Sequence, residues 1–216
     1  AKVGAEEISL PDESTDWVED LKQGARSIED LVGFGFITAK EARSLLKTTS
    51  KFKFQVGRYY LSLIDRNNPD CPIRRQAIPS HLEMQFDALE RTDPVGDDVH
   101  RVTPLLIHRY ADRVLLMPTL NCPMYCRYCF RKVGINDAAP SFIKYWSGSL
   151  DYLKAHPEIE EVILSGGDPL MASDGTLKRV FEGLREVKHL RRVRIHTRVP
   201  VTLPSRVTQR LSGIFA

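Results

Sequence analysis

The sequence predicts an α/β protein with two regions, a mainly helical region over residues 1–105 and a parallel sheet covered by helices over residues 106–216. Two observations support this prediction. Short apolar runs alternate with segments whose apolar residues recur at helical spacing. In the second region these segments follow the order strand, helix, strand, helix, strand, which is typical of parallel sheets.

The first region carries helix-start signals and proline-rich turns. In TAKEARSLLK, Thr38 and Glu41 have the spacing of a capping box, and we expect Ala42, Leu45 and Leu46 to be buried on one face. The segment VGRYYLSLI continues in a helical pattern. Prolines between residues 69 and 104 separate short pieces, so this region is expected to form a helical cap or arm.

The second region contains three expected strands, RVLLMPT at 113–119, EEVILSGG at 160–167 and RRVRIHT at 191–197. Two helices are expected between them, SFIKYWSGSLDYLKAH and DGTLKRVFEGLREV. Their spacing predicts that the inward-facing side chains are Trp146, Leu150, Leu153, Leu177, Phe181 and Leu184.

The composition excludes several classes of protein. The chain has 216 residues, of which 42% are hydrophobic and 27% charged, so it can bury a core. It has no apolar run of membrane-spanning length and no basic leader, and we expect a cytoplasmic protein without a membrane partner. The net charge of +3 comes without an aromatic-interleaved basic patch, so no nucleic-acid partner is expected. Because the chain starts at Ala1 and stops within the apparent helix RVTQRLSGIFA, we expect it to be a fragment.

Three motifs follow the three expected strands. A cysteine cluster comes after the first strand, SGGDP after the second, and HTRVP at the end of the third. Functional sites of parallel sheets form at the carboxyl ends of the strands. The three motifs are therefore expected to meet on one face.

Three of the four cysteines, Cys122, Cys126 and Cys129, lie within eight residues. A structural zinc site needs four ligands, usually in two pairs, and the distant Cys71 lies in the helical region. Three thiolates on a four-iron cluster leave one iron open for another ligand. A zinc knuckle or a fortuitous cluster of thiols is the alternative.

The cysteine spacing C-x-x-x-C-x-x-C, with Tyr128 before the last cysteine, resembles that of the radical S-adenosylmethionine superfamily. The resemblance narrows to the lysine 2,3-aminomutase family, including its branch that makes β-lysine for modifying an elongation factor, through four segments: IHRYADRVLL, CPMYCRYCFRK, SGGDPLMASD and RIHTRVPVTLPSRVT. It implies that residues 106–216 form the first half of a parallel partial (β/α) barrel. It also implies an isomerase that converts L-lysine to β-lysine with a [4Fe-4S] cluster, S-adenosylmethionine and pyridoxal phosphate.

The resemblance assigns roles residue by residue. The three clustered cysteines would hold the [4Fe-4S] cluster. Tyr128 would pack near the adenine, and the strand end formed by Gly166, Gly167 and Asp168 would meet the methionyl amino group of S-adenosylmethionine. Arg109, Tyr110 and Arg113 would hold the phosphate of pyridoxal phosphate, and Arg131 would clamp the carboxylate of the amino-acid substrate. It further implies a reductant protein such as flavodoxin or ferredoxin, and it leaves a homo-oligomer open for the full-length enzyme.

Each assignment has a structural alternative. GGDP is also a common strand-to-helix turn, HRYADR is also a solvated turn in which Asp112 pairs with an arginine, and Arg131 could balance the charge of a cluster. In the third strand a period of two places Arg192, Arg194, His196 and Arg198 on one face. His196 and Arg198 are either directed into the site or part of a solvated or ion-paired strand end, and neither receives a role.

The chain contains no residue that matches the family's Schiff-base lysine or its acidic substrate-recognition residues. Arginine or glutamate therefore remain alternative substrates, and a non-catalytic iron–sulfur or zinc-binding module remains an alternative function.

Overall fold

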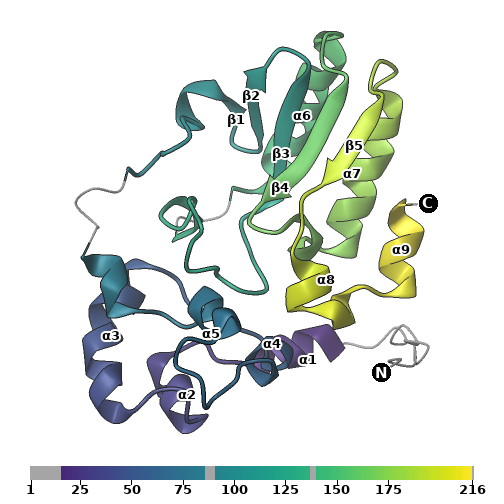
Figure 1. The fold of residues 1–216 in the computed structure, drawn as a ribbon. Helices are drawn as coiled ribbons and strands as arrows, with labels where there is room; N and C mark the ends of the chain where they lie inside the picture. The colour runs from purple at the N-terminus through teal and green to yellow at the C-terminus, as the bar shows by residue number, and fades with distance from the viewer. Residues whose placement is uncertain (1–15, 86–90, 137–139, 216) are drawn as a thin grey trace, which may run out of the picture.

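A computed structural model describes residues 16–85, 91–136 and 140–215 (Figure 1). The described helices and strands run in the order α1 Asp16–Lys22, α2 Ile28–Gly33, α3 Ala39–Lys51, α4 Arg58–Ser62, α5 Pro72–Ala77, β1 Arg101–Thr103, β2 Leu106–Tyr110, β3 Arg113–Thr119, α6 Phe142–Ala155, β4 Glu161–Gly166, α7 Asp174–Glu186, β5 Arg192–Ile195, α8 Val199–Thr202 and α9 Gln209–Phe215. The chain is an α/β protein with a mixed five-stranded sheet.

The predicted capping box begins α3. The Thr38 side chain accepts from the backbone N–H of Glu41, and the Glu41 carboxylate accepts from the backbone N–H of Thr38 at 2.7 Å. Leu45 is buried and Ala42 packs against the same core, as predicted. The prediction for Leu46 was wrong, because its side chain is 55% exposed. Adjacent helix positions differ by about 100° in direction, so Leu45 and Leu46 do not share a face.

The sheet has the strand order β1-β2-β3-β4-β5. Strands β3, β4 and β5 are parallel, with Leu116 opposite Leu164 and Leu164 opposite Ile195. These strands and helices α6 and α7 confirm the predicted order. The buried apolar positions of β3 and β4 face the helices, which agrees with the expectation of a helix-covered parallel sheet.

The antiparallel edge of the sheet was not predicted. Strand β2 pairs antiparallel with β3, and β1 pairs antiparallel with β2. The segment HRYADR was placed before the first expected strand, with a solvated turn as its structural alternative, yet its first three residues belong to β2. The buried Leu106 and Ile107 anchor this strand, and Asp112 lies at the turn of the hairpin. A run of only a few apolar residues is too short to distinguish a strand from a loop.

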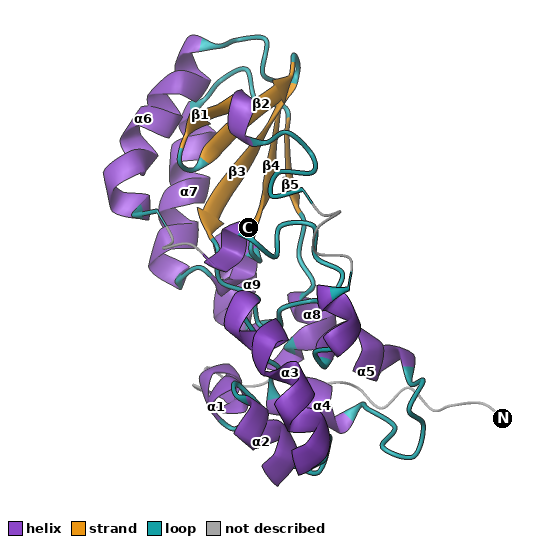
Figure 2. Cartoon of the chain, turned by 90° about the vertical axis from the view of Figure 1, so that its left-hand side faces the viewer, coloured by secondary structure: helices purple, strands orange, loops and turns teal. Residues whose placement is uncertain are grey.

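Helices α6 and α7 cover one face of the sheet, and the helical region α1–α5 lies beyond the carboxyl ends of β3, β4 and β5 (Figure 2). The inward-facing residues predicted for α6 and α7 all pack in apolar clusters, with Leu153 and Leu177 fully buried. No helix in the described part of the chain is long and apolar enough to cross a membrane.

A buried arginine fixes the loop that follows β4. Arg206, 2% exposed, donates from Nε to the carbonyl of Leu170 at 2.9 Å and from Nη2 to the carboxylate of Asp174 at 2.6 Å. Its guanidinium also lies over the ring of Trp17 in α1. The loop after β4 is therefore held from both the sheet region and the helical region.

Candidate iron–sulfur and cofactor site

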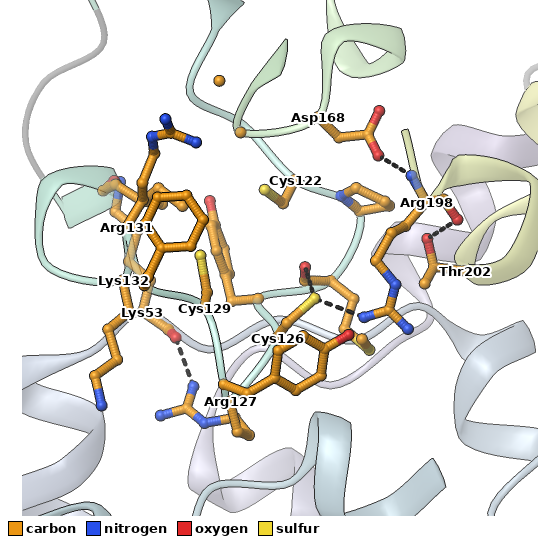
Figure 3. A pocket seen from close by; sticks show the side chains of 18 of the residues that line it. Lys53, Cys122, Cys126, Arg127, Cys129, Arg131, Lys132, Asp168, Arg198 and Thr202 are labelled. Atoms are coloured by element: carbon orange, nitrogen blue, oxygen red, sulfur yellow. Dashed lines mark hydrogen bonds between the residues drawn. The ribbon is translucent and has the colours of Figure 1, made fainter. Parts of the chain in front are cut away.

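The three predicted motifs meet in a cavity of about 230 Å³ (Figure 3). Its lining includes Cys122, Cys126 and Cys129 from the loop after β3, residues 166–168 at the end of β4, and Arg198 after β5. This confirms the prediction that the carboxyl ends of the parallel strands bring the motifs together. Cys71 does not line this cavity and packs in the core of the helical region.

The cysteine loop is anchored on the helical region. The backbone N–H of Tyr125 donates to the carbonyl of Gln55 at 3.2 Å, and that of Arg127 donates to the carbonyl of Gln76 at 2.9 Å. The Arg127 guanidinium forms a buried ion pair with Glu83 at 2.6 Å. Helix α5 and its neighbours thus fix the conformation of the loop that carries the thiols.

The three thiols are free and partly buried, and Cys126 and Cys129 lie close enough to Cys122 to influence its pKa. Burial raises the pKa of Cys122, and the negative charges of Asp168, Cys129 and Cys126 raise it further. Burial also raises the pKa of Cys129. Deprotonated thiols at this position need a positive partner, which a metal centre would supply.

The donor set fits an iron–sulfur cluster better than a single zinc ion. Within residues 16–85, 91–136 and 140–215, no three His, Cys, Asp or Glu side chains are arranged to hold one metal ion. In a four-iron cluster each cysteine binds a different iron. The thiols that hold such a cluster therefore lie farther apart than the ligands of one zinc ion. Three thiols around one cavity therefore fit the larger group.

Gly166 and Gly167 allow the end of β4 to approach the start of the cysteine loop. Gly166 has a φ of +115°, and a Cβ there would lie 2.5 Å from the carbonyl oxygen of Thr119. A Cβ on Gly167 would overlap the backbone of Leu120 and Asn121. The N–H of Gly167 donates to the carbonyl of Thr119 at 3.0 Å, which ties the two segments together.

Replacing Gly166 with alanine is expected to lower the free energy of unfolding by about 1–3 kcal/mol, because the added Cβ strains the backbone and meets a fixed carbonyl. Urea denaturation of the purified chain measures the change. The matched control is Gly148→Ala in α6, where a Cβ meets nothing within 4 Å, and it is expected to stabilise the helix by about 0.5–1 kcal/mol. Equal stability of Gly166→Ala and the unmodified chain would contradict the expected strain.

The Asp168 carboxylate ties two strand ends together. It is 4% exposed, and it accepts from the Thr197 hydroxyl at 2.7 Å and from the backbone N–H of Arg198 at 2.7 Å. Its Oδ1 also accepts from the N–H of Leu170, as in a strand-to-helix turn. Burial raises the pKa of Asp168, while these hydrogen bonds lower it. Both interpretations of GGDP therefore hold locally, since the segment is a turn that also lines the cavity.

Arg198 lies in the site and His196 does not. The Arg198 guanidinium donates from Nη1 to the Cys126 sulfur at 2.8 Å and from Nη2 to the Gln76 amide oxygen at 2.9 Å. His196 is exposed and is not among the residues lining the cavity. Strand β5 ends at Ile195, so the alternation extrapolated beyond it was wrong, and Thr197 also reaches the site.

Tyr128 stands at the rim of the cavity. Its side chain is 62% exposed, and the Arg198 guanidinium lies 5.5 Å from its ring centroid. An exposed aromatic face beside the cysteines is available to stack on a planar ligand group.

Arg131 lines the cavity and is already paired. Its Nε and Nη2 both donate to one oxygen, Oδ2 of Asp97, at 2.9 and 2.8 Å. The two side chains are 20% and 14% exposed. Asp97 is fixed in turn because its N–H donates to the carboxylate of Asp93, whose pKa is lowered chiefly by the N–H groups of Asp98 and Asp97. Sequence reasoning missed Asp97, which carries no local marker of this contact.

Arg109, Tyr110 and Arg113 lie together, but not in the cysteine cavity. The two guanidiniums lie 5.7 and 5.5 Å from the ring centroid of Tyr110 at the β2–β3 hairpin. Arg113 starts β3, whereas the cysteines follow its end. Arg113 forms a two-pronged pair with Asp112 at 2.9 and 3.1 Å, which is the pairing of the alternative interpretation, and Arg109 donates to the carbonyl of Val95.

Comparison with known proteins identifies relatives over almost the whole chain. No family model matches the chain. It is 38% identical over 197 residues to the L-lysine 2,3-aminomutase of Clostridium subterminale, an alignment that covers 91% of this chain and 47% of the relative. It is 35% identical to the proteins of that name from Escherichia coli K12 and Methanococcus maripaludis, covering 93% and 94% of this chain and 59% and 48% of the relatives. The chain thus spans about half the length of the relatives it matches. The chain belongs to the lysine 2,3-aminomutase family.

Proposed function

We propose that the complete protein is a radical S-adenosylmethionine amino-acid 2,3-aminomutase that converts L-lysine to β-lysine, and that residues 106–216 are the first half of its partial barrel. The observation that carries this proposal is the convergence of three thiols, a glycine-rich strand end and Arg131 around one cavity in a chain of this family. On the same resemblance we propose that the complete protein is located in the cytoplasm, receives electrons from a flavodoxin- or ferredoxin-type protein and forms a homo-oligomer.

Cys122, Cys126 and Cys129 would hold a [4Fe-4S] cluster, and the absence of a fourth cysteine from the cavity supports an iron that is open to S-adenosylmethionine. When bound, the cluster and S-adenosylmethionine supply the radical chemistry, and the protein supplies placement and exclusion of water. The partly buried cysteine loop and the helical region beneath it serve that second task.

The rim of the cavity would orient S-adenosylmethionine. Tyr128 offers an exposed ring for the adenine, and the backbone at Gly166 and Gly167 can approach a ligand closely because no Cβ intervenes. The carboxylate of Asp168 has its own partners in Thr197 and Arg198, so its contribution is to hold the strand end in position.

Arg109, Tyr110 and Arg113 would hold the phosphate of pyridoxal phosphate. The guanidiniums of Arg109 and Arg113 both lie near the Tyr110 ring, and together with the Tyr110 hydroxyl they are suitable hydrogen-bond donors for a dianionic phosphate. Asp112 occupies the fork of Arg113, so a phosphate there would share or replace that contact.

Arg131 would bind the carboxylate of the amino-acid substrate. Asp97 occupies the Nε–Nη2 edge of its guanidinium through a single oxygen. The Nη1–Nη2 edge is the remaining two-pronged face, and this is the face that we expect the carboxylate to use.

The test of the function is product formation by the complete protein. The anaerobically reconstituted enzyme, supplied with pyridoxal phosphate, S-adenosylmethionine and dithionite, is expected to convert L-lysine to β-lysine faster than it isomerises L-arginine or L-glutamate. A preference for either of these amino acids would change the substrate. A complete protein that binds iron and cleaves no S-adenosylmethionine would instead be a non-catalytic iron–sulfur module.

A further inference from the structure

We propose that Arg198 raises the reduction potential of the cluster by donating a hydrogen bond to Cys126, and that Gln76 positions it for this contact. The inference rests on the proposed function in one respect, that a [4Fe-4S] cluster binds at the three cysteines. It adds a role for Arg198 and a role for the helical region that neither the motifs nor the relatives assign.

The first observation is the contact itself. Nη1 of Arg198 lies 2.8 Å from the sulfur of Cys126, and the dashed line in Figure 3 marks this hydrogen bond. A thiolate bound to iron keeps lone pairs on its sulfur, so it can still accept this N–H. The contact is therefore compatible with a loaded site.

The second observation is that Arg198 is fixed from several sides. Nη2 donates to the amide oxygen of Gln76 at 2.9 Å, and the backbone N–H donates to Asp168 at 2.7 Å. Its carbonyl accepts from the hydroxyl of Thr202 at 2.9 Å. Both terminal nitrogens of the Arg198 guanidinium have partners, and so do the N–H and the carbonyl of its backbone. The guanidinium is therefore pre-organised toward the sulfur.

The third observation distinguishes Arg198 from two other arginines at the cavity. Arg127 is paired with Glu83 and Arg131 is paired with Asp97, so the positive charge of each is compensated. In the described part of the chain, the Arg198 guanidinium makes no ion pair with a carboxylate, and its side-chain partners are the Cys126 thiol, the neutral Gln76 amide and the Tyr128 ring. Its charge therefore acts on the cysteine loop with little compensation.

The expected effect follows from charge. A one-electron reduction takes [4Fe-4S]²⁺ to [4Fe-4S]⁺ and adds negative charge that spreads over the thiolate sulfurs. A cationic N–H donor on one of those sulfurs stabilises the reduced state more than the oxidised state, and hydrogen bonds to sulfur are among the determinants of cluster potential. Removing the donor makes the cluster harder to reduce.

The experiment compares the reduction potentials of clusters reconstituted anaerobically in this chain. The variants are Arg198→Met, Arg198→Lys and Gln76→Leu. The matched control is Arg194→Met, which removes the same charge from a residue of β5 that is paired with Glu161 of β4. Iron and sulfide are counted first, and a dithionite titration followed by electron paramagnetic resonance then gives each potential.

At a fixed solution potential, Arg198→Met is expected to lower the ratio of reduced to oxidised cluster about tenfold, a shift of about 59 mV to more negative potential for a one-electron couple. Arg198→Lys and Gln76→Leu are expected to shift in the same direction by less, and Arg194→Met is expected to match the unmodified chain.

Equal potentials for Arg198→Met and the unmodified chain overturn the inference, and so does an equal shift in Arg194→Met. If Arg198→Met takes up no iron, Arg198→Lys and Gln76→Leu decide, and unchanged potentials in both overturn it. An unmodified chain that binds no iron and sulfide overturns the proposed function instead, which distinguishes the two failures.

Discussion

Alanine in place of Cys122, Cys126 or Cys129 is expected to abolish the cluster, whereas Cys71→Ala is expected to leave about four irons per chain. Each of the three thiols lines the cavity and would bind a different iron, so the loss of one leaves a second iron without a protein ligand. Cys71 is buried in the helical core and does not line the cavity. Iron and sulfide content after anaerobic reconstitution measures the difference.

Cys71→Ser complements this comparison, because it changes the same buried position without removing its volume. Full iron content in both Cys71 variants, together with an unchanged unfolding midpoint in Cys71→Ser, would separate ligand loss from misfolding. Loss of the cluster in both Cys71 variants would show that Cys71 is a ligand and that the assigned set is wrong. Bound zinc without sulfide after strictly anaerobic preparation would favour a zinc-binding module.

Arg131→Met in the complete protein is expected to weaken substrate binding by about 2–5 kcal/mol. The reason is that the substitution removes the guanidinium that would pair with the substrate carboxylate, and so leaves one member of a buried charged pair without its partner. Arg131→Lys is expected to restore only part of the loss, since an ammonium cannot make the two-pronged contact. Iron content and substrate-free cleavage of S-adenosylmethionine are expected to remain unchanged. The substrate KM and these two controls are measured in parallel.

Asp97→Asn tests whether the observed pair matters for the same step. The amide keeps the size of the side chain and weakens its hold on the Arg131 guanidinium, so KM is expected to rise by less than in Arg131→Met. An Arg131→Met variant that loses its cluster while its KM is unchanged would show that Arg131 balances the charge of the metal site instead.

The sequence predicts the parts of the fold that depend on local pattern. The Thr38–Glu41 capping box is defined by two residues three positions apart, and each of the strands β3, β4 and β5 is marked by a pattern within its own few residues. The rule that sites form at the carboxyl ends of parallel strands then predicts that the cysteines and the glycine-rich strand end meet.

The remaining features depend on contacts between distant residues. The pair Asp97–Arg131 spans 34 positions, and the contact between Gln76 and Arg198 spans 122. Neither Asp97 nor Gln76 differs locally from any other polar residue in a loop or short helix. The hairpin strand β2 was missed because its apolar run is short and its last residues, Arg109 and Tyr110, are exposed.

The most direct test of the central claim is electron paramagnetic resonance of the reduced, reconstituted chain with and without S-adenosylmethionine. If three cysteines leave one iron open, the chain should show the signal of a reduced [4Fe-4S] cluster, and S-adenosylmethionine should change that signal by coordinating the open iron. S-Adenosylhomocysteine serves as a control for ligands that resemble the cofactor but lack its sulfonium charge. A cluster whose spectrum stays the same at saturating S-adenosylmethionine, or a chain that binds no iron and sulfide, would contradict the account.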